Sequence, residues 1–229
     1  MNTSLDSETI KEKVAVIVPA WNEERDIQLV LEVLGPIKWL AQVVVIDDGS
    51  TDATFKVAQD CAKKFPRMSV MTLGENQGKG SAMLAGINAL SPEVETVIFL
   101  DADLIGLTED HLRSLMRPVR NHECEMSVAI FKKGYWRTDI SQKYAPNLNG
   151  QRCLSQKLAK EAVIPLANSG YGVEIGLTLY ARKNNWRIQY VDWPGMTHMM
   201  KEHKLGRVEG YRVRIMMYQQ ILNAWIRGL

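Results

Sequence analysis

The first half of the chain alternates between short apolar runs and amphipathic segments. A continuous apolar, β-branched run is typical of a strand that is covered on both faces, as in a parallel sheet. Three such runs and a fourth, mixed strand at 68–73 are each followed by a segment that is expected to be helical. This order predicts an α/β fold with a Rossmann-like, mostly parallel sheet and helices on both faces. The expected strands are 14–18, 43–46, 68–73 and 97–100, and the expected helices are 22–34, 52–64, 81–90 and 108–115.

The second half has a looser pattern. The start of the chain, 1–13, is polar and is expected to be a tail. No repeat, low-complexity run or linker interrupts the rest of the chain, so we expect one domain at 14–229. Segment 134–149 is polar and irregular and is expected to form a loop over the site. The expected elements are strands at 126–131 and 187–191 and helices at 154–164, 170–183 and 208–225.

Composition narrows the class of protein. The chain has 229 residues, 46% of them hydrophobic, which is enough for one sizeable core. Its formal net charge of +2 is too small to indicate a nucleic-acid partner. The three cysteines lack Cys-x-x-Cys spacing and are expected to be reduced thiols. The start lacks the apolar core of a signal peptide, and no run reaches the roughly 18 apolar residues of a membrane span. We therefore expect a cytoplasmic protein, at most peripheral at a membrane surface.

Two carboxylates, Asp101 and Asp103, follow the fourth apolar run. In an extended backbone they would leave the same side of the chain, since side chains repeat every two residues. Like charges at that spacing repel unless a cation lies between them. Oxygen ligands of this kind suit Mg²⁺ or Mn²⁺, which typically bridge to nucleotide phosphates. The simpler interpretation is a strand end that turns through two solvated aspartates.

Other polar residues follow the earlier strands. Ligands of parallel sheets bind beyond the carboxyl ends of the strands, where we expect Asn22, Glu23, Asp48 and Lys79 to converge. Asn22 is also expected to cap the first helix. Asp48 is suited to accept a hydrogen bond from a ribose hydroxyl or a base N–H. The alternative is that it holds the Gly49–Ser50 turn. Lys79, flanked by glycines, is suited to bind phosphate oxygens, and the alternative is that it belongs to an ordinary solvated loop.

Three candidates lie in the second half. His198 follows an expected strand and would complete a metal site begun by Asp103, or it is a polar loop residue. Glu174, near a helix start, would position an acceptor hydroxyl or act as a base, or it merely favours the helix dipole. Arg152 would bind a phosphate bidentately or cap a surface.

Two common nucleotide-binding motifs are absent. The 74–80 loop lacks Gly-x-x-x-x-Gly-Lys-Ser/Thr, which disfavours a P-loop hydrolase. The first strand is followed by Pro-Ala-Trp-Asn-Glu-Glu instead of Gly-x-Gly-x-x-Gly, which disfavours a dinucleotide dehydrogenase. A nucleotidyltransferase usually has a glycine-rich loop at the same place. A catalytically silent binding protein is the other alternative, although the chain keeps its carboxylates.

Four motifs in order, at 16–24, 44–52, 76–80 and 99–104, resemble family 2 glycosyltransferases of the GT-A fold. The resemblance implies hexose transfer from a nucleoside diphosphate sugar (UDP- or GDP-sugar), with Mg²⁺ or Mn²⁺ on the diphosphate. It implies a nucleotide-sugar-binding half at 14–115 and an acceptor-binding half at 116–229. By position, the resemblance assigns the binding of the base and ribose to Pro19, Ala20, Asn22, Glu23 and Asp48. It assigns Lys79 to the nucleotide, Asp101 to the ribose or the metal, and Asp103 to the metal.

The acceptor half resembles two subfamilies. Segments 149–152 and 204–206 resemble polyprenyl- and dolichyl-phosphate sugar transferases, whose acceptor is an anionic lipid phosphate. Segment 170–176 with His198 is similar to glucosyl-3-phosphoglycerate synthases, which use a small phosphorylated acceptor, retain anomeric configuration and bind the metal through the matching histidine. Of these two acceptors, we expect the lipid phosphate. The apolar stripe of 208–225 suits a membrane surface or a second copy in a homodimer, although packing on its own domain is the simpler interpretation.

Overall fold

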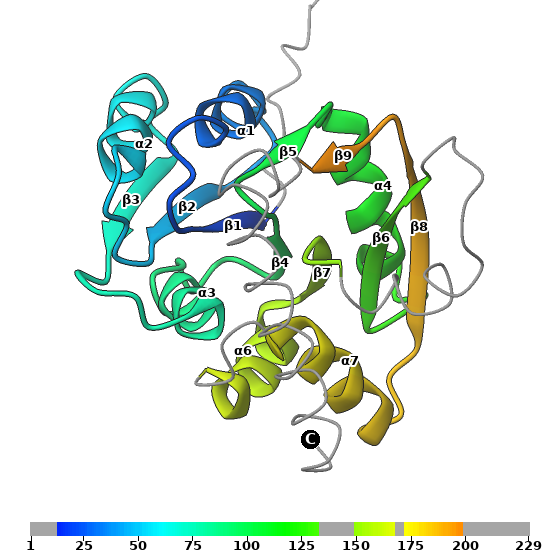
Figure 1. Cartoon of the computed structure of the whole chain (residues 1–229). Helices are drawn as coiled ribbons and strands as arrows, with labels where there is room; N and C mark the ends of the chain where they lie inside the picture. The colour runs from blue at the N-terminus through cyan, green and yellow to red at the C-terminus, as the bar shows by residue number, and fades with distance from the viewer. Residues whose placement is uncertain (1–12, 133–148, 168–171, 199–229) are drawn as a thin grey trace, which may run out of the picture.

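The computed structural model describes residues 13–132, 149–167 and 172–198 (Figure 1). Their main sheet has seven strands in the order β3-β2-β1-β4-β7-β6-β8, and a second, two-stranded sheet pairs β5 with β9. The strands are β1 (Val14–Ala20), β2 (Gln42–Asp47), β3 (Met68–Thr72), β4 (Thr96–Phe99), β5 (Leu104–Ile105), β6 (Met126–Lys132), β7 (Arg152–Ser155), β8 (Ile188–Pro194) and β9 (Thr197–His198). The helices are α1 (Ile27–Leu34), α2 (Thr54–Ala62), α3 (Lys79–Asn88), α4 (Glu109–Arg120), α6 (Gln156–Val163), the short 3₁₀ turn η2 (Ile164–Leu166) and α7 (Val173–Lys183).

The first four strands of the main sheet are parallel, as the apolar runs predicted. Strand β1 pairs with β2 and β4, and β2 pairs with β3. Strand β7 interrupts this order because it runs antiparallel to both of its neighbours, β4 and β6. Strand β8 then pairs parallel to β6. The predicted α/β class with a mostly parallel, GT-A-like sheet is confirmed.

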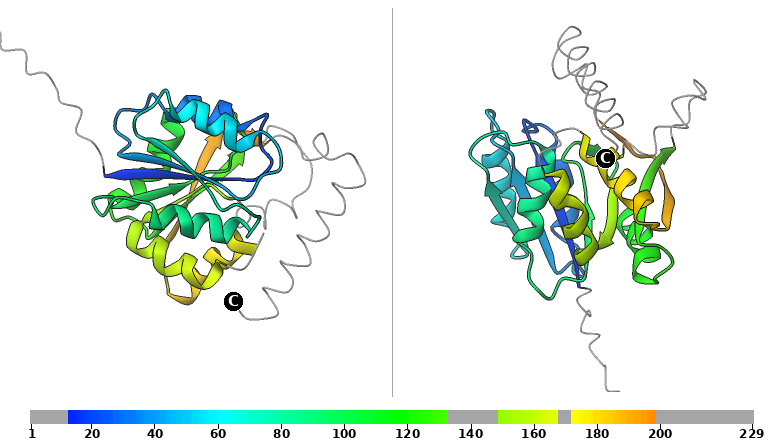
Figure 2. Two further views of the ribbon diagram at one scale, coloured as in Figure 1. Left: turned by 90° about the vertical axis from the view of Figure 1, so that its left-hand side faces the viewer. Right: turned by 90° about the horizontal axis from the view of Figure 1, so that it is seen from below.

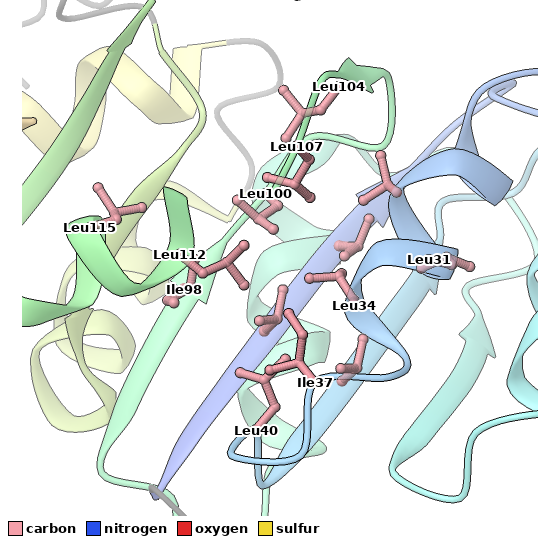
Figure 3. Close-up of a cluster of buried hydrophobic side chains, with 14 of the residues drawn as sticks. Leu31, Leu34, Ile37, Leu40, Ile98, Leu100, Leu104, Leu107, Leu112 and Leu115 are labelled. Atoms are coloured by element: carbon pink, nitrogen blue, oxygen red, sulfur yellow. The ribbon is translucent and has the colours of Figure 1, made fainter. Parts of the chain in front are cut away.

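Helices cover both faces of the sheet (Figure 2). Alternate residues of β1 point to opposite faces, so Val16 joins one core and Ile17 the other. The first core takes buried residues from α1, α2 and α4, and the second takes them from α3, α6 and α7. Figure 3 shows part of the first core, where leucines and isoleucines from α1, α4 and the end of β4 lie together. Burial on both faces explains the apolar runs of β1, β2 and β4. Strand β3 lies at an edge of the sheet, and most of its residues are partly or fully exposed.

Some predicted boundaries were wrong for local reasons. Asn22 does not cap α1, which begins at Ile27 with Asp26 as its N-cap residue. Asn22 instead has a φ of 54°, and its side chain accepts a hydrogen bond from the Thr51 amide. The helix expected at 154–164 begins at Gln156 because the preceding residues form β7, which pairs with β4. Strands β5 and β9 have two residues each and are too short for sequence periodicity to reveal.

Helix α4 follows its prediction at the start and extends past it. Thr108 caps it, and the side chains of Thr108 and His111 form a reciprocal capping box. The helix continues beyond Leu115 to Arg120 because its apolar face continues through Met116. Within the described residues, no helix is long and apolar enough to cross a membrane. Residues 1–12 of the expected tail lie outside the described residues, as do most of the 134–149 loop, segment 204–206 and the 208–225 helix.

The two leucines of α1 that differ most in burial test the first core. Leu34 is fully buried, whereas Leu29 is 51% exposed. We expect Leu34→Ala to lower the free energy of unfolding by about 2–5 kcal/mol, because it removes buried methyl groups and leaves a cavity. Leu29→Ala should change it by under about 0.5 kcal/mol. Urea unfolding followed by circular dichroism measures both, and equal losses would contradict this packing.

Candidate active site

The loops after β1 and β2 are joined by hydrogen bonds. The amide of Asn22 donates to Ser50 Oγ at 3.0 Å, and the amide of Thr51 donates back to Asn22 Oδ1 at 2.9 Å. The amide of Glu23 donates to Thr54 Oγ1 at 2.7 Å. The structure therefore brings together two loops that the sequence predicted at one edge of the sheet. It also shows that Asn22 has a structural role in joining them.

Pro19 and Ala20 end β1 inside the sheet, in register with Ile46 and Asp47 of β2. Ala20 is 3% exposed, and its carbonyl accepts a hydrogen bond from the amide of Asp48 at 2.8 Å. These residues thus lie at the end of β1, where the loops after β1 and β2 meet. Whether they contact a nucleotide base stays a prediction.

Asp48 holds the loop that precedes α3. Its two carboxylate oxygens accept hydrogen bonds from the amides of Gln77 at 2.8 Å and Gly78 at 2.9 Å. Burial raises the pKa of Asp48, and these two amides oppose that rise. The alternative that Asp48 holds the Gly49–Ser50 turn was wrong, because Asp47 bonds to the Ser50 amide at 3.3 Å.

Lys79 lies between two carboxylates. As the first residue of α3, it places Nζ 2.5 Å from Asp101 Oδ1 and 2.6 Å from Glu174 Oε1. Burial alone would lower the pKa of Lys79, but the charges and hydrogen bonds of Asp101 and Glu174 raise it well above its usual range. The side chains of Lys79, Asp101 and Glu174 are 21%, 20% and 14% exposed. The alternative that Lys79 is an ordinary solvated residue was therefore wrong.

Contacts between α3 and η2 align this group. Ser81 Oγ donates to the Ala167 carbonyl at 2.9 Å. A Cβ at Gly80 would lie 2.5 Å from the Leu166 carbonyl oxygen, so only glycine allows this approach. The start of α3 is thereby fixed against the segment that leads into α7. Glu174, in the first turn of α7, then meets Lys79, so its role extends beyond the helix dipole.

The second oxygen of Asp101 is also bonded. Gln151 Nε2 donates to Asp101 Oδ2 at 2.7 Å. Gly150 packs against the same pair, since a Cβ there would lie 2.6 Å from Lys79 Nζ and 2.7 Å from Asp101 Oδ2. Sequence reasoning missed Gln151 and Gly150. The only signal was the Asn-Gly-Gln-Arg segment, in which Arg152 had drawn attention as the charged residue.

Arg152 lies inside the protein. It is fully buried on β7, where Nη1 donates to Thr178 Oγ1 at 2.9 Å and Nε donates to the Asn149 carbonyl at 3.0 Å. Burial lowers the pKa of Arg152 to about 10, although Glu174 and Asp101 act to raise it. The expectation of a surface cap was wrong. The enclosed guanidinium also disfavours direct contact with a phosphate.

Asp103 lies in the turn between β4 and β5. Because β4 ends at Phe99 and the chain turns at 102–103, the extended-backbone argument for Asp101 and Asp103 does not hold. Asp103 is only 7% exposed, so it is not a solvated strand end. Strand β5 pairs antiparallel to β9, which places the backbone of His198 opposite Leu104. The three-ligand set of Asp101, Asp103 and His198 stays a prediction, since the described residues contain no group of three or more His, Cys, Asp or Glu that could hold a metal.

The close packing of Gly150 generates a test. We expect Gly150→Ala to lower the free energy of unfolding by about 1–3 kcal/mol, because the added methyl group must push Asp101 and Lys79 apart. Gly172→Ala is the matched control, since a Cβ there would meet no atom of the described residues within 4 Å. Urea unfolding of both variants checks this, and similar midpoints would show that Gly150 is not tightly packed.

Similar proteins indicate the family and the fold of this chain. A family model described as glycosyl transferase family 2 matches residues 15–176. A dolichyl-phosphate β-glucosyltransferase of Drosophila melanogaster is 35% identical over 142 residues, which cover 56% of this chain and 42% of that protein. An undecaprenyl-phosphate 4-deoxy-4-formamido-L-arabinose transferase of Photorhabdus laumondii is 37% identical over 104 residues, 43% of this chain and 31% of that protein. The matches thus span less than half of these relatives.

Among solved structures, glucosyl-3-phosphoglycerate synthase of Mycobacterium tuberculosis with Mn²⁺, UDP-glucose and glycerol 3-phosphate has a TM-score of 0.72. At 22% identity, the match covers 94% of this chain and 79% of that one. A complex of the same enzyme with Mg²⁺ and UDP has a TM-score of 0.70 at 22% identity, covering 94% and 78%. At this identity the likeness shows the GT-A fold. The family model matches more than half of the residues of this chain, so the chain belongs to glycosyl transferase family 2.

Proposed function

We propose that this protein transfers a hexose from a UDP- or GDP-sugar to a polyprenyl-phosphate lipid, with Mg²⁺ or Mn²⁺ on the diphosphate. The observation that carries the proposal is the contact of Lys79 with Asp101 and Glu174 at the edge of the sheet where β4 ends. The buried Asp103 follows two residues after Asp101 in the sequence. In a family 2 chain, this is the edge of the sheet where a nucleotide ligand is expected.

The donor nucleotide would lie across the loops after β1 and β2. Pro19, Ala20 and Glu23 would border the base and ribose. Because the carboxylate of Asp48 is already bonded to Gln77 and Gly78, its contribution would be to hold the wall of this site. The joined loops would supply a rigid edge, which lowers the entropy cost of binding.

The carboxylates fit a hard divalent cation. Mg²⁺ is usually held by one or two carboxylates together with substrate phosphates, so Asp103 and Asp101 form a sufficient protein ligand set. His198 would be a further ligand, because backbone pairing places it opposite the residue that follows Asp103. When bound, the cation would offset the negative charge that grows on the leaving diphosphate.

The other charged groups would orient the sugar. Asp101 and Glu174 share the single ammonium of Lys79. A carboxylate accepts several hydrogen bonds, so both side chains would also accept from hydroxyl groups of the donor sugar. The ammonium of Lys79 would add positive charge near the diphosphate. A phosphate acceptor is already anionic, so Glu174 would not need to act as a base.

The acceptor class rests on the relatives. Their names specify dolichyl phosphate or undecaprenyl phosphate, and the matched segments cover 43–56% of this chain in the two cases described. A lipid phosphate is presented at a membrane surface, so peripheral membrane contact of an otherwise cytoplasmic protein belongs to this proposal, as does contact of the 208–225 stripe with lipid or with a second copy.

A small phosphorylated acceptor is the second candidate. The fold match to the Mycobacterium tuberculosis synthase covers 94% of this chain, and Glu174 lies in the segment that resembles that subfamily. Transfer would then retain anomeric configuration, whereas a directly attacking lipid phosphate would invert it.

Donor binding tests the proposal. We expect one nucleotide sugar, with Mn²⁺, to raise the melting temperature and to be hydrolysed slowly. Asp103→Asn should remove the Mn²⁺-dependent shift and lower turnover by about 100-fold or more, because it removes a charged metal ligand. The matched control is Asp110→Asn, an exposed aspartate in the first turn of α4, which should behave as the wild type.

The acceptor is then found by supplying polyprenyl phosphate in detergent micelles or 3-phosphoglycerate in parallel reactions. Lipid-linked hexose as the product would support the proposal, and product from phosphoglycerate alone would favour the second candidate. Absence of a thermal shift with every UDP- and GDP-sugar tried would overturn both.

A further inference from the structure

The imidazole of His111 contacts two segments that are far apart in the sequence. On one side, Nδ1 accepts a hydrogen bond from the Thr108 amide at 3.2 Å, within the capping box of α4. On the other side, Nε2 lies 3.2 Å from the carbonyl oxygen of Pro194, the last residue of β8. The same ring packs on the buried Trp193, with 5.1 Å between the ring centroids. One side chain thus joins the start of α4 to the end of β8.

The contact with Thr108 determines which ring nitrogen carries the hydrogen. Because the Thr108 amide donates to Nδ1, that nitrogen has no hydrogen of its own. The hydrogen of the neutral ring is then on Nε2, which donates it to the Pro194 carbonyl. A capping box usually has glutamate or glutamine at this position, and either would satisfy the Thr108 amide. What histidine adds to the cap is the second hydrogen bond, to Pro194.

The two segments that His111 joins lead directly to β5 and β9. Strand β5 continues through Gly106 into α4, and β8 continues through Gly195 into β9. These connections are closely packed, since a Cβ at Gly106 would lie 2.9 Å from the Gly195 carbonyl oxygen. The β5–β9 ladder itself has only two residue pairs, with His198 opposite Leu104 at its far end. So short a ladder is marginal by itself, and its stability depends on contacts that join its two arms.

Two candidate metal ligands lie at the end of this ladder that is away from His111. Asp103 directly precedes β5, and His198 is the last residue of β9. The antiparallel pairing places the backbone of His198 opposite Leu104, the neighbour of Asp103. A metal site binds its ion tightly only when surrounding contacts hold its ligands in place. The ladder therefore sets how close the two backbones lie, and His111 closes the ladder at its other end.

We propose that His111 is a positioning residue, whose hydrogen bond to Pro194 holds β9 against β5 and thereby places His198 for the divalent cation beside Asp103. This inference rests on the proposed function, in which His198 is a further ligand of that cation. His111 itself would touch neither the cation nor the substrate. Its effect on the site would be carried by the position of the backbone.

Two nearly isosteric variants separate this hydrogen bond from the helix cap. His111→Gln and His111→Glu both introduce an ordinary capping-box residue, so both keep the start of α4. Only the glutamine has an N–H group that donates to the Pro194 carbonyl. His111→Glu is therefore the test, and His111→Gln is its matched control. The negative charge of the glutamate attracts a cation, so it opposes the loss of metal affinity that we expect.

The first measurement is hydrogen exchange of the backbone amides of β5 and β9 in the protein without ligands. We expect these amides to exchange about 5- to 10-fold faster in His111→Glu than in the wild type, the worth of one hydrogen bond. His111→Gln should exchange at close to the wild-type rate. Equal rates in His111→Glu and the wild type would overturn the inference, whatever the protein binds.

The second measurement is the affinity for Mn²⁺ in the presence of UDP or GDP, obtained from the electron paramagnetic resonance signal of free Mn²⁺. His111→Glu should bind Mn²⁺ about 5- to 10-fold more weakly than His111→Gln. When both variants also carry His198→Ala, this difference should nearly vanish, because the ligand that His111 positions is already gone. An equal difference with and without His198, or no difference in either case, would overturn the role of His111 in placing His198.

Failure of the proposed function gives a different result. If the wild type binds no Mn²⁺ with either nucleotide, the metal site is wrong and the role of His111 in it is wrong as well, even where the exchange rates differ as expected. If the wild type binds Mn²⁺ with a nucleotide while His111→Glu and His111→Gln behave alike, only the inference about His111 fails.

Discussion

The ammonium of Lys79 between the carboxylates of Asp101 and Glu174 is the interaction on which the candidate site depends. It joins the start of α3, the loop after β4 and the first turn of α7, which are far apart in sequence. A partly buried cation is stabilised here only because two opposite charges lie within hydrogen-bonding distance. Two carboxylates would otherwise repel each other at the same place. This contact therefore links the three elements at one edge of the sheet.

The structure supports this contact from two sides. Gly80 and Ser81 hold the start of α3 against Leu166 and Ala167 at the end of η2, and Leu166 in turn packs closely on Gly176 of α7. On the other side, Gly150 and Gln151 pack directly on Asp101, and they lie there because β7 inserts antiparallel between β4 and β6. Strand β7 thus brings the second half of the chain against the carboxyl ends of the parallel strands.

Further hydrogen bonds join the loops at this edge of the sheet. Asp48 reaches from the end of β2 to the backbone before Lys79, and Asn22 joins the loop after β1 to the loop after β2. Residues that resemble ligand contacts in the family motifs thus also hold the edge of the sheet rigid. The hydrogen bonds of this chain show the structural role of these motif residues, and their contact with a ligand stays a prediction.

The sequence by itself determined the four strand–helix units and the convergence of Asp48, Lys79 and Asp101 at one edge of the sheet. Apolar periodicity is a local property, and parallel strands collect their carboxyl ends at one edge whatever the details of packing. Only the tertiary structure decided that Arg152 is buried, that Gln151 bonds to Asp101 and that Glu174 pairs with Lys79. Those outcomes depend on which distant segments meet and on the charge and burial that each side chain finds there, and spacing along the chain encodes neither.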